Sequence, residues 1–170
     1  MYHIFRFIYV RRCELEVVLS LGRIKMKKLL TLPNILKACG ALLGLVAFFL
    51  MFADQLYAEI LGNKGYVEFS DAMFDKDFGS WITFIGYLLV LIGALGLCAC
   101  VFLKDKKLAK LVTFALAGAL VLGAIFIFIE AAVVNGRADA KLYHLAAGPI
   151  FAGIFALLAG LLGCGSEFVK

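Results

Sequence analysis

Charged residues are scarce in this 170-residue sequence, and four long stretches have none. These stretches are Ala38–Ala53, Trp81–Leu103, Leu111–Ile129 and Leu145–Ser166, with 16, 23, 19 and 22 residues. A bilayer core about 30 Å thick is crossed by roughly 20 helical residues. Together with a hydrophobic content of 64%, the four stretches exclude a soluble domain and predict four membrane spans.

Alternation of apolar and polar residues is also missing from these stretches, which excludes the strands of a membrane β-barrel. In lipid each backbone N–H needs a partner within the chain, and a helix supplies it. The predicted fold class is therefore an all-α integral membrane protein, a left-handed antiparallel four-helix bundle. The predicted spans cover about 35–53, 81–103, 110–130 and 145–166, joined by an outer loop 54–80, a cytoplasmic loop 104–109 and an outer loop 131–144. Lys37 lies inside the first span, and we expect its amine to extend back to the interface.

Basic residues are few in the two outer loops. Of 17 Lys and Arg residues, 13 lie in segment 1–37, in segment 104–110 or at Lys170. The positive-inside rule then places both termini and the 104–109 loop in the cytoplasm. This predicts a multi-pass protein of a plasma membrane. It leaves no exposed basic face for nucleic acid, so no nucleic-acid partner is expected.

Residues 1–25 differ from the rest of the chain. The run from Met26 to Lys28 is typical of a bacterial start, and Gly22-Arg23 can be encoded by a ribosome-binding sequence. One interpretation is that translation begins at Met26, with 1–25 as an extension and 26–170 as the membrane domain of a bacterial inner-membrane protein. The alternative is that 1–25 is a juxtamembrane segment on the inner leaflet.

Small residues recur at helical spacing in three of the four spans. Lipid tails are as apolar as leucine, so membrane helices associate through close approach of their backbones. We expect these stripes to face other helices of the same chain. Alternatively, the GxxxG pair in the first span makes a dimer or receives a helix of a partner protein. The candidates for helix packing or partner contact are Gly40, Gly44, Ala115, Ala119, Gly123, Ala152, Ala156 and Gly160.

The first outer loop is acidic and unusually rich in phenylalanine. A functionless loop of this length is uncommon, so we expect it to fold over the outer mouth of the bundle and to serve in recognition. Asn63-Lys64-Gly65 and Asn135-Gly136 predict turns, and the alternation of Tyr66–Phe69 predicts a short strand. The recognition candidates are Glu68, Asp71, Phe74, Asp75, Asp77 and Phe78.

Signatures of common membrane enzymes, such as HExxH and GxSxG, are absent. No charged group lies in the middle of a span, where ion-coupled transporters usually have one. We therefore expect no enzymatic activity. Glu130 and Asp54, near the outer mouth, are the candidates for an alternative function as a transporter or channel subunit, although the position of Glu130 favours interfacial anchoring.

Cysteine is absent from both outer loops, so no extracellular disulfide is predicted. Cysteine packs like a small apolar residue, and we predict neither a metal nor a cofactor. Acylation or metal binding by the cytoplasmic-side cysteines stays open, and His144 is expected to be an interfacial residue. The cysteines near the cytoplasmic ends of the spans are Cys39, Cys98, Cys100 and Cys164.

The acidic first outer loop, the lysine-rich 104–110 hairpin and the Ala/Gly-rich last span resemble the layout of small four-span bacterial membrane proteins. The larger loop comes first, which is similar to claudin-type tetraspans. Their Gly-Leu-Trp and paired-cysteine signature is missing from loop 54–79. The resemblance therefore implies a layout and carries over no function.

These observations predict a small structural or accessory integral membrane protein that acts through helix packing and its acidic outer loop. Its expected partners are the lipid bilayer and either another membrane protein or a second copy of the chain. A transporter or channel subunit is the alternative.

Overall fold

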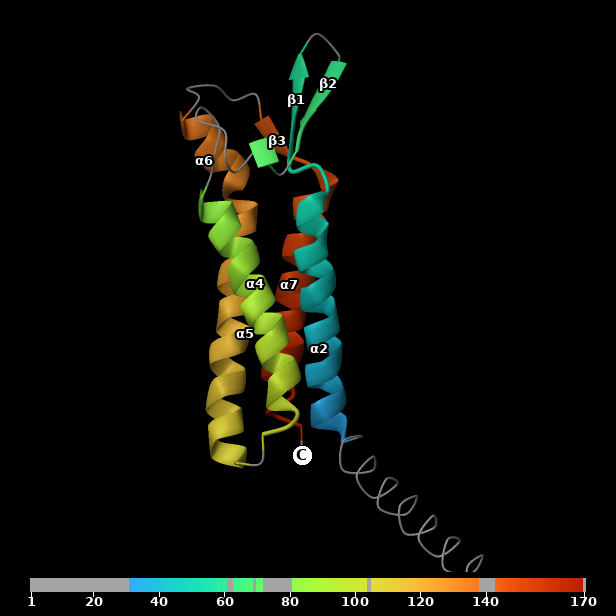
Figure 1. Ribbon diagram of the computed structural model, residues 1–170, viewed down its shortest axis with the longest axis vertical. Coiled ribbons are helices and arrows are strands. Elements are labelled where there is room, and N and C mark those ends of the chain that lie inside the picture. The colour runs from blue at the N-terminus through green and yellow to red at the C-terminus, as the bar shows by residue number, and fades with distance from the viewer. Residues whose placement is uncertain are drawn as a thin grey trace, which may run out of the picture.

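The computed structural model describes residues 31–60, 63–68, 70–71, 81–103, 105–137 and 143–169. Four helices within these residues pack side by side (Figure 1). They are α2 (Leu32–Phe49, extended by the 3-10 turn η1, Leu50–Phe52), α4 (Trp81–Cys100), α5 (Lys106–Phe128) and α7 (Ala147–Gly165). All four are long and apolar enough to cross a membrane. The prediction of a helical multi-pass membrane protein is confirmed at this level.

The four helices form a ring in which each packs against two neighbours. Helix α2 contacts α4 and α7, and α5 contacts the same two helices. The chain runs alternately up and down the bundle, so the described part begins and ends at the end away from the strands (Figure 1).

Local sequence explains where the helices begin. Pro33 occupies the first turn of α2, where its missing N–H costs nothing. The Asp105 carboxylate caps α5 by accepting hydrogen bonds from the backbone N–H groups of Lys107 (2.9 Å) and Leu108 (3.4 Å). Capping at Asp105 starts α5 at Lys106, before the predicted boundary near 110.

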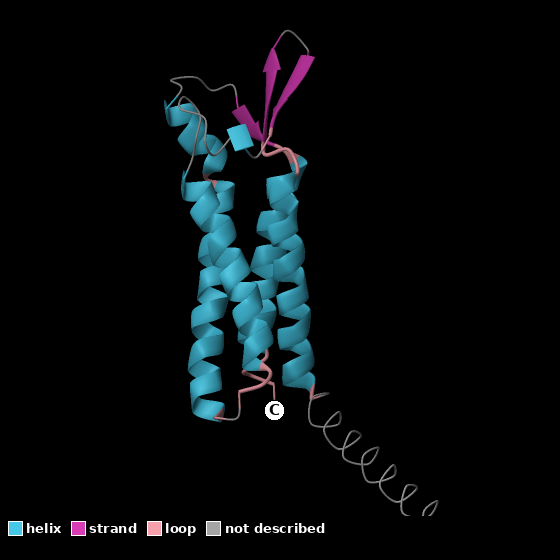
Figure 2. Ribbon diagram, viewed as in Figure 1, coloured by secondary structure: helices cyan, strands magenta, loops and turns pink. Residues whose placement is uncertain are grey.

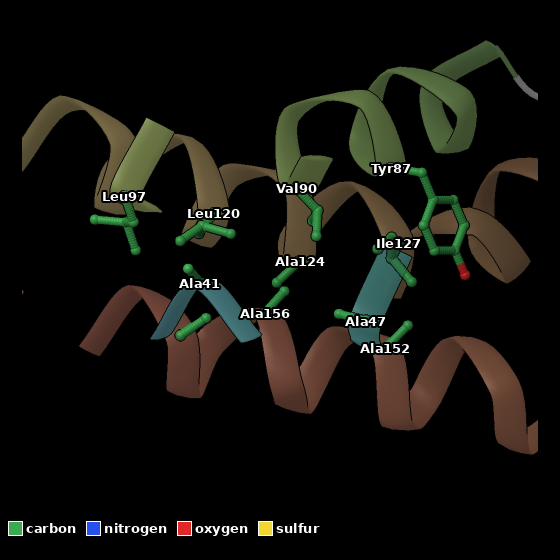
Figure 3. Packing of buried hydrophobic residues seen from close by; sticks show 11 residues of the cluster. Ala41, Ala47, Tyr87, Val90, Leu97, Leu120, Ala124, Ile127, Ala152 and Ala156 are labelled. Atoms are coloured by element: carbon green, nitrogen blue, oxygen red, sulfur yellow. The ribbon is translucent and has the colours of Figure 1, made fainter. Parts of the chain in front are cut away.

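The core is built from small residues of α2 and α7 facing larger ones of α4 and α5. Figure 3 shows Ala41 and Ala47 of α2 and Ala152 and Ala156 of α7 against Leu97, Leu120 and Ile127. The backbones of α4 and α5 approach each other closely: a Cβ atom added at Gly123 would lie 2.7 Å from the carbonyl oxygen of Gly86. Close backbone contact is what membrane helices use in place of hydrophobic burial.

A small sheet at one end of the bundle corrects the all-α prediction (Figure 2). It consists of β1 (Leu56–Ile60), β2 (Asn63–Val67) and β3 (Tyr143–Leu145), in the order β2-β1-β3 and antiparallel throughout. The sheet ties the connection between α2 and α4 to the connection between α5 and α7. The predicted turn at Asn63-Lys64-Gly65 is wrong: all three residues lie in β2, because the register pairs Ile60 with Asn63 and the chain reverses earlier. Tyr66 and Val67 are in β2 as predicted.

The predicted turn at Asn135-Gly136 is also wrong, since both residues belong to helix α6 (Glu130–Arg137). The Asn135 side chain serves a different purpose. Its amide nitrogen donates to the carbonyl of Tyr143 (2.8 Å), and its amide oxygen accepts from the N–H of Tyr143 (2.9 Å). These two hydrogen bonds fasten α6 to β3.

Candidate functional site

A cluster of polar side chains lies buried at the sheet end of the bundle. Gln55, Thr83, Tyr87 and Glu130 are each 0% exposed. They come from the segment after η1, from α4 and from the start of α6. Figure 3 shows the ring of Tyr87 at the edge of the apolar core, near Ile127, with its hydroxyl pointing away from Val90.

Gln55 organises one half of the cluster. Its amide nitrogen donates to the backbone carbonyls of Met51 and Ala53, both at 2.7 Å, and its amide oxygen accepts from the Tyr87 hydroxyl at 3.0 Å. The backbone of Gln55 continues the connection, because its N–H donates to Val67 in β2 and its carbonyl accepts from Ala146. Gln55 therefore holds the end of the first span, α4 and the sheet together. Sequence analysis missed this residue, because an isolated glutamine carries no pattern.

Glu130 forms the other half of the cluster, and its side chain is buried in the protein interior. The backbone N–H groups of Ile129 and Val133 donate to Ile125 and Ile129, so the helical turn continues from α5 into α6. The buried stripe of α5 continues with it, through Ile127 and Glu130 to Val134. That three-to-four-residue spacing is the signal from which burial of Glu130 could have been found.

The Glu130 carboxyl has few polar neighbours in the described part of the chain. The Thr83 hydroxyl approaches it, yet neither carboxyl oxygen has a partner at full hydrogen-bond geometry. Glu130 lies just beyond the end of the third span. Burial raises the pKa of this carboxyl from 4.5 to about 8, against the opposing effect of Thr83.

A second polar feature is an open pocket of about 490 Å³ lined by Phe52, Asp54, Glu68 and Ser70. The register pairs Leu56 with Val67, which places the flanking acids Asp54 and Glu68 near each other. The recognition candidate Asp71 is exposed and accepts a hydrogen bond from Ser70 (3.3 Å). The remaining candidates, Phe74, Asp75, Asp77 and Phe78, lie outside the described residues.

The small-residue candidates fall on different faces of their helices. Gly40, Gly44, Gly123, Ala152, Ala156 and Gly160 are buried in the bundle. Ala115 is exposed and Ala119 half-buried, because the inner stripe of α5 follows another register. That inner stripe comprises Ala109, Thr113, Ala117, Leu120, Gly123, Ala124 and Ile127.

At the opposite end of the bundle Lys37 is buried, and its amine forms an ion pair with Glu167, which follows α7. Cys39 and Cys98 are exposed, Cys100 is buried and Cys164 is half-buried. Within the described ranges no group of three or more metal-ligating side chains is present. His144 is exposed and packs against the ring of Tyr57, with 5.4 Å between ring centroids.

The chain is thus a helical multi-pass membrane protein with a small sheet joining its two longer connections. No family model, curated protein or solved structure matches it.

Proposed function

We propose that this protein is a non-enzymatic accessory protein of a plasma membrane, which recognises another membrane protein through its sheet-covered end. The observation that carries the proposal is the pocket lined by Asp54 and Glu68. Both acids are exposed, and neither forms an ion pair within the part of the chain described. Two neighbouring carboxylates repel each other and attract a basic group, so the pocket fits a lysine or arginine side chain from a partner.

The rigidity of this end supports a role in recognition. Hydrogen bonds from Gln55 and Asn135 fasten the sheet to the helices on two sides. A platform that is ordered before binding loses less entropy on association. The phenyl ring of Phe52 supplies an apolar wall for the methylene groups of a basic side chain.

The test is co-purification of the full chain from its native membranes in mild detergent. The unmodified protein is expected to retain a stoichiometric membrane-protein partner, and the double variant Asp54→Asn/Glu68→Gln to lose it. Glu59→Gln is the matched control, because Glu59 is also exposed but does not line the pocket. A monodisperse single chain without partner, or equal retention by all three proteins, contradicts the proposal.

The orientation belongs to the same proposal. The lysine-rich start of α5 lies at the end opposite the sheet (Figure 1), and positive residues favour the cytoplasmic side. We propose that both termini are cytoplasmic and that the membrane is a bacterial inner membrane. In a chain without native cysteines, Glu68→Cys should react with an impermeant maleimide on intact cells, whereas Lys107→Cys should not.

A second candidate function, a transporter or channel subunit, is favoured by the burial of Glu130. A carboxyl buried at the end of a membrane helix is costly and is usually retained for function. Solute or ion flux in proteoliposomes that is lost in Glu130→Gln would support this function. Absence of flux over a panel of cations and small solutes would count against it.

A further inference from the structure

Glu130 is fully buried and Glu167 is partly buried, and the surroundings of the two acids differ. Glu167 has Lys37 as a counter-ion, with 2.6 Å between the amine and one carboxylate oxygen. Glu130 forms no ion pair with any described side chain, and both of its oxygens are inaccessible to solvent. An ionised carboxylate is very costly to bury without compensation. Glu130 is therefore either protonated or paired with a positive charge from outside the described chain.

The described side chains around Glu130 offer no such charge. Leu111–Ile129 and Ala147–Ser166 contain no charged residue, and α4 contributes Thr83 and the neutral Tyr87. The segment after η1 contributes Gln55, while the nearby Asp54 is exposed and also acidic. On β3, His144 is exposed and lies against Tyr57.

The other members of this polar cluster carry oxygen atoms. Thr83 and Tyr87 each bring a hydroxyl, and the side-chain oxygen of Gln55 is 3.0 Å from the Tyr87 hydroxyl. Thr83 and Tyr87 both lie near enough to interact electrostatically with the carboxylate. Carboxylate, hydroxyl and amide oxygens are hard ligands, which suit hard cations.

Charge balance limits the cation further. One carboxylate is neutralised by one monovalent cation, whereas a divalent cation would leave an uncompensated positive charge buried in the same place. We propose that Glu130, Thr83, Tyr87 and Gln55 form a buried, exchangeable site for one small monovalent cation, either a proton or Na⁺. This site supplies the coupling ion for the transporter that is the second candidate function. The cation site and the transport function can fail separately, because ion binding is measured without any flux.

The test uses a hydrophobic carbodiimide on the full chain in detergent. The protonated carboxyl adds across one C=N bond: its oxygen bonds to the carbodiimide carbon and its proton moves to nitrogen. An acyl shift then gives a stable N-acylurea, so the labelled peptide gains the whole mass of the reagent. Labelling is followed by peptide mass spectrometry from about pH 5 to about pH 9, in matched NaCl and KCl.

We expect one label at Glu130 that persists at neutral pH and falls in alkaline solution. If Na⁺ lowers the labelling several-fold and K⁺ does not, the site takes Na⁺. If labelling depends on pH alone, the ligand is the proton. No label at Glu130 at any pH overturns the proposal, and so does a pH profile that matches that of the exposed carboxyl Glu68.

Three variants keep the test specific. Glu130→Gln should remove the label and Glu68→Gln should leave it, since Glu68 is exposed in the outer pocket. Tyr87→Phe retains the ring and removes one oxygen ligand, so any Na⁺ protection should weaken. Equal Na⁺ protection in Tyr87→Phe would exclude the Tyr87 hydroxyl as a ligand. Flux without Glu130 labelling would support transport while overturning this site.

Discussion

The amine of Lys37 lies 2.6 Å from a carboxylate oxygen of Glu167, at the end of the bundle away from the sheet. Their side chains are only 7% and 13% exposed. Lys37 belongs to the first helix of the ring, and Glu167 follows the last. The ion pair therefore closes the ring between α2 and α7.

Removing one member of this pair should destabilise the protein. Lys37→Met or Glu167→Leu is each expected to lower the free energy of unfolding by about 3 kcal/mol, because a buried charge is left uncompensated. The double variant Lys37→Met/Glu167→Leu should recover much of the loss. The measurement is a double-mutant cycle followed by unfolding in mild detergent. Strictly additive losses would mean that the two side chains do not interact.

The close contact of α4 and α5 predicts a contrast between two glycines of α5. In Gly123→Ala the new methyl would lie 2.7 Å from the Gly86 carbonyl and 2.8 Å from a methyl of Val90, which should cost about 2 kcal/mol. At Gly118 an added Cβ meets nothing within 4 Å. Gly118→Ala should therefore be neutral or slightly stabilising, because alanine has the higher helix propensity. Equal thermal unfolding midpoints for the two variants would refute this packing.

Much of this fold could be predicted because long uncharged runs leave the chain few alternatives. In lipid a run such as Trp81–Leu103 satisfies its backbone by becoming a helix, whatever its neighbours are. The end of α5 was harder to predict. Glu130 looks like an interfacial residue when composition alone is considered, but the helical turn continues past Phe128 and carries it to the buried face.

Apart from the strand at Tyr66 and Val67, the sheet could not be predicted, because its pairing depends on distant residues. The segment Tyr143–Leu145 has three residues and no strand pattern of its own. It pairs with β1, although α4, α5 and α6 lie between the two strands in the sequence. Asn135-Gly136 reads locally as a turn, but Asn135 binds Tyr143 and remains helical. Tertiary hydrogen bonds here override local propensity.

The bonds from Asn135 to Tyr143 predict a local effect. Asn135→Ala removes one donor and one acceptor and should release β3 from α6, at a cost of about 2 kcal/mol. Hydrogen exchange should then speed up at Tyr143–Leu145 while the core of α4 stays protected. Asn63→Ala is the control, because Asn63 is exposed in β2. Unchanged exchange at β3 would show that β1 alone holds the strand.

The hydrogen bond between Tyr87 and Gln55 predicts a graded loss of stability. Tyr87→Phe leaves the Gln55 oxygen buried without its donor and should cost about 1 kcal/mol. Gln55→Leu should cost more, because it also leaves the carbonyls of Met51 and Ala53 without the donor. Tyr66→Phe should be neutral, since Tyr66 is exposed. Chemical unfolding of the three variants under one detergent condition checks the order, and a reversed order would contradict it.

The buried carboxyl of Glu130 predicts that stability falls as the pH rises. In the unfolded chain this carboxyl releases its proton near pH 4.5, whereas burial raises the pKa in the folded protein to about 8. Between these values the folded protein binds more protons than the unfolded one, so raising the pH favours unfolding. The contribution is most favourable below pH 4.5, declines through pH 8 and is then constant. The measurement is the thermal unfolding midpoint against pH for the unmodified protein and for Glu130→Gln. Subtracting the two profiles removes the effect of the exposed acids. Parallel profiles would show that the pKa of Glu130 is the same in the folded and unfolded states, which contradicts the prediction.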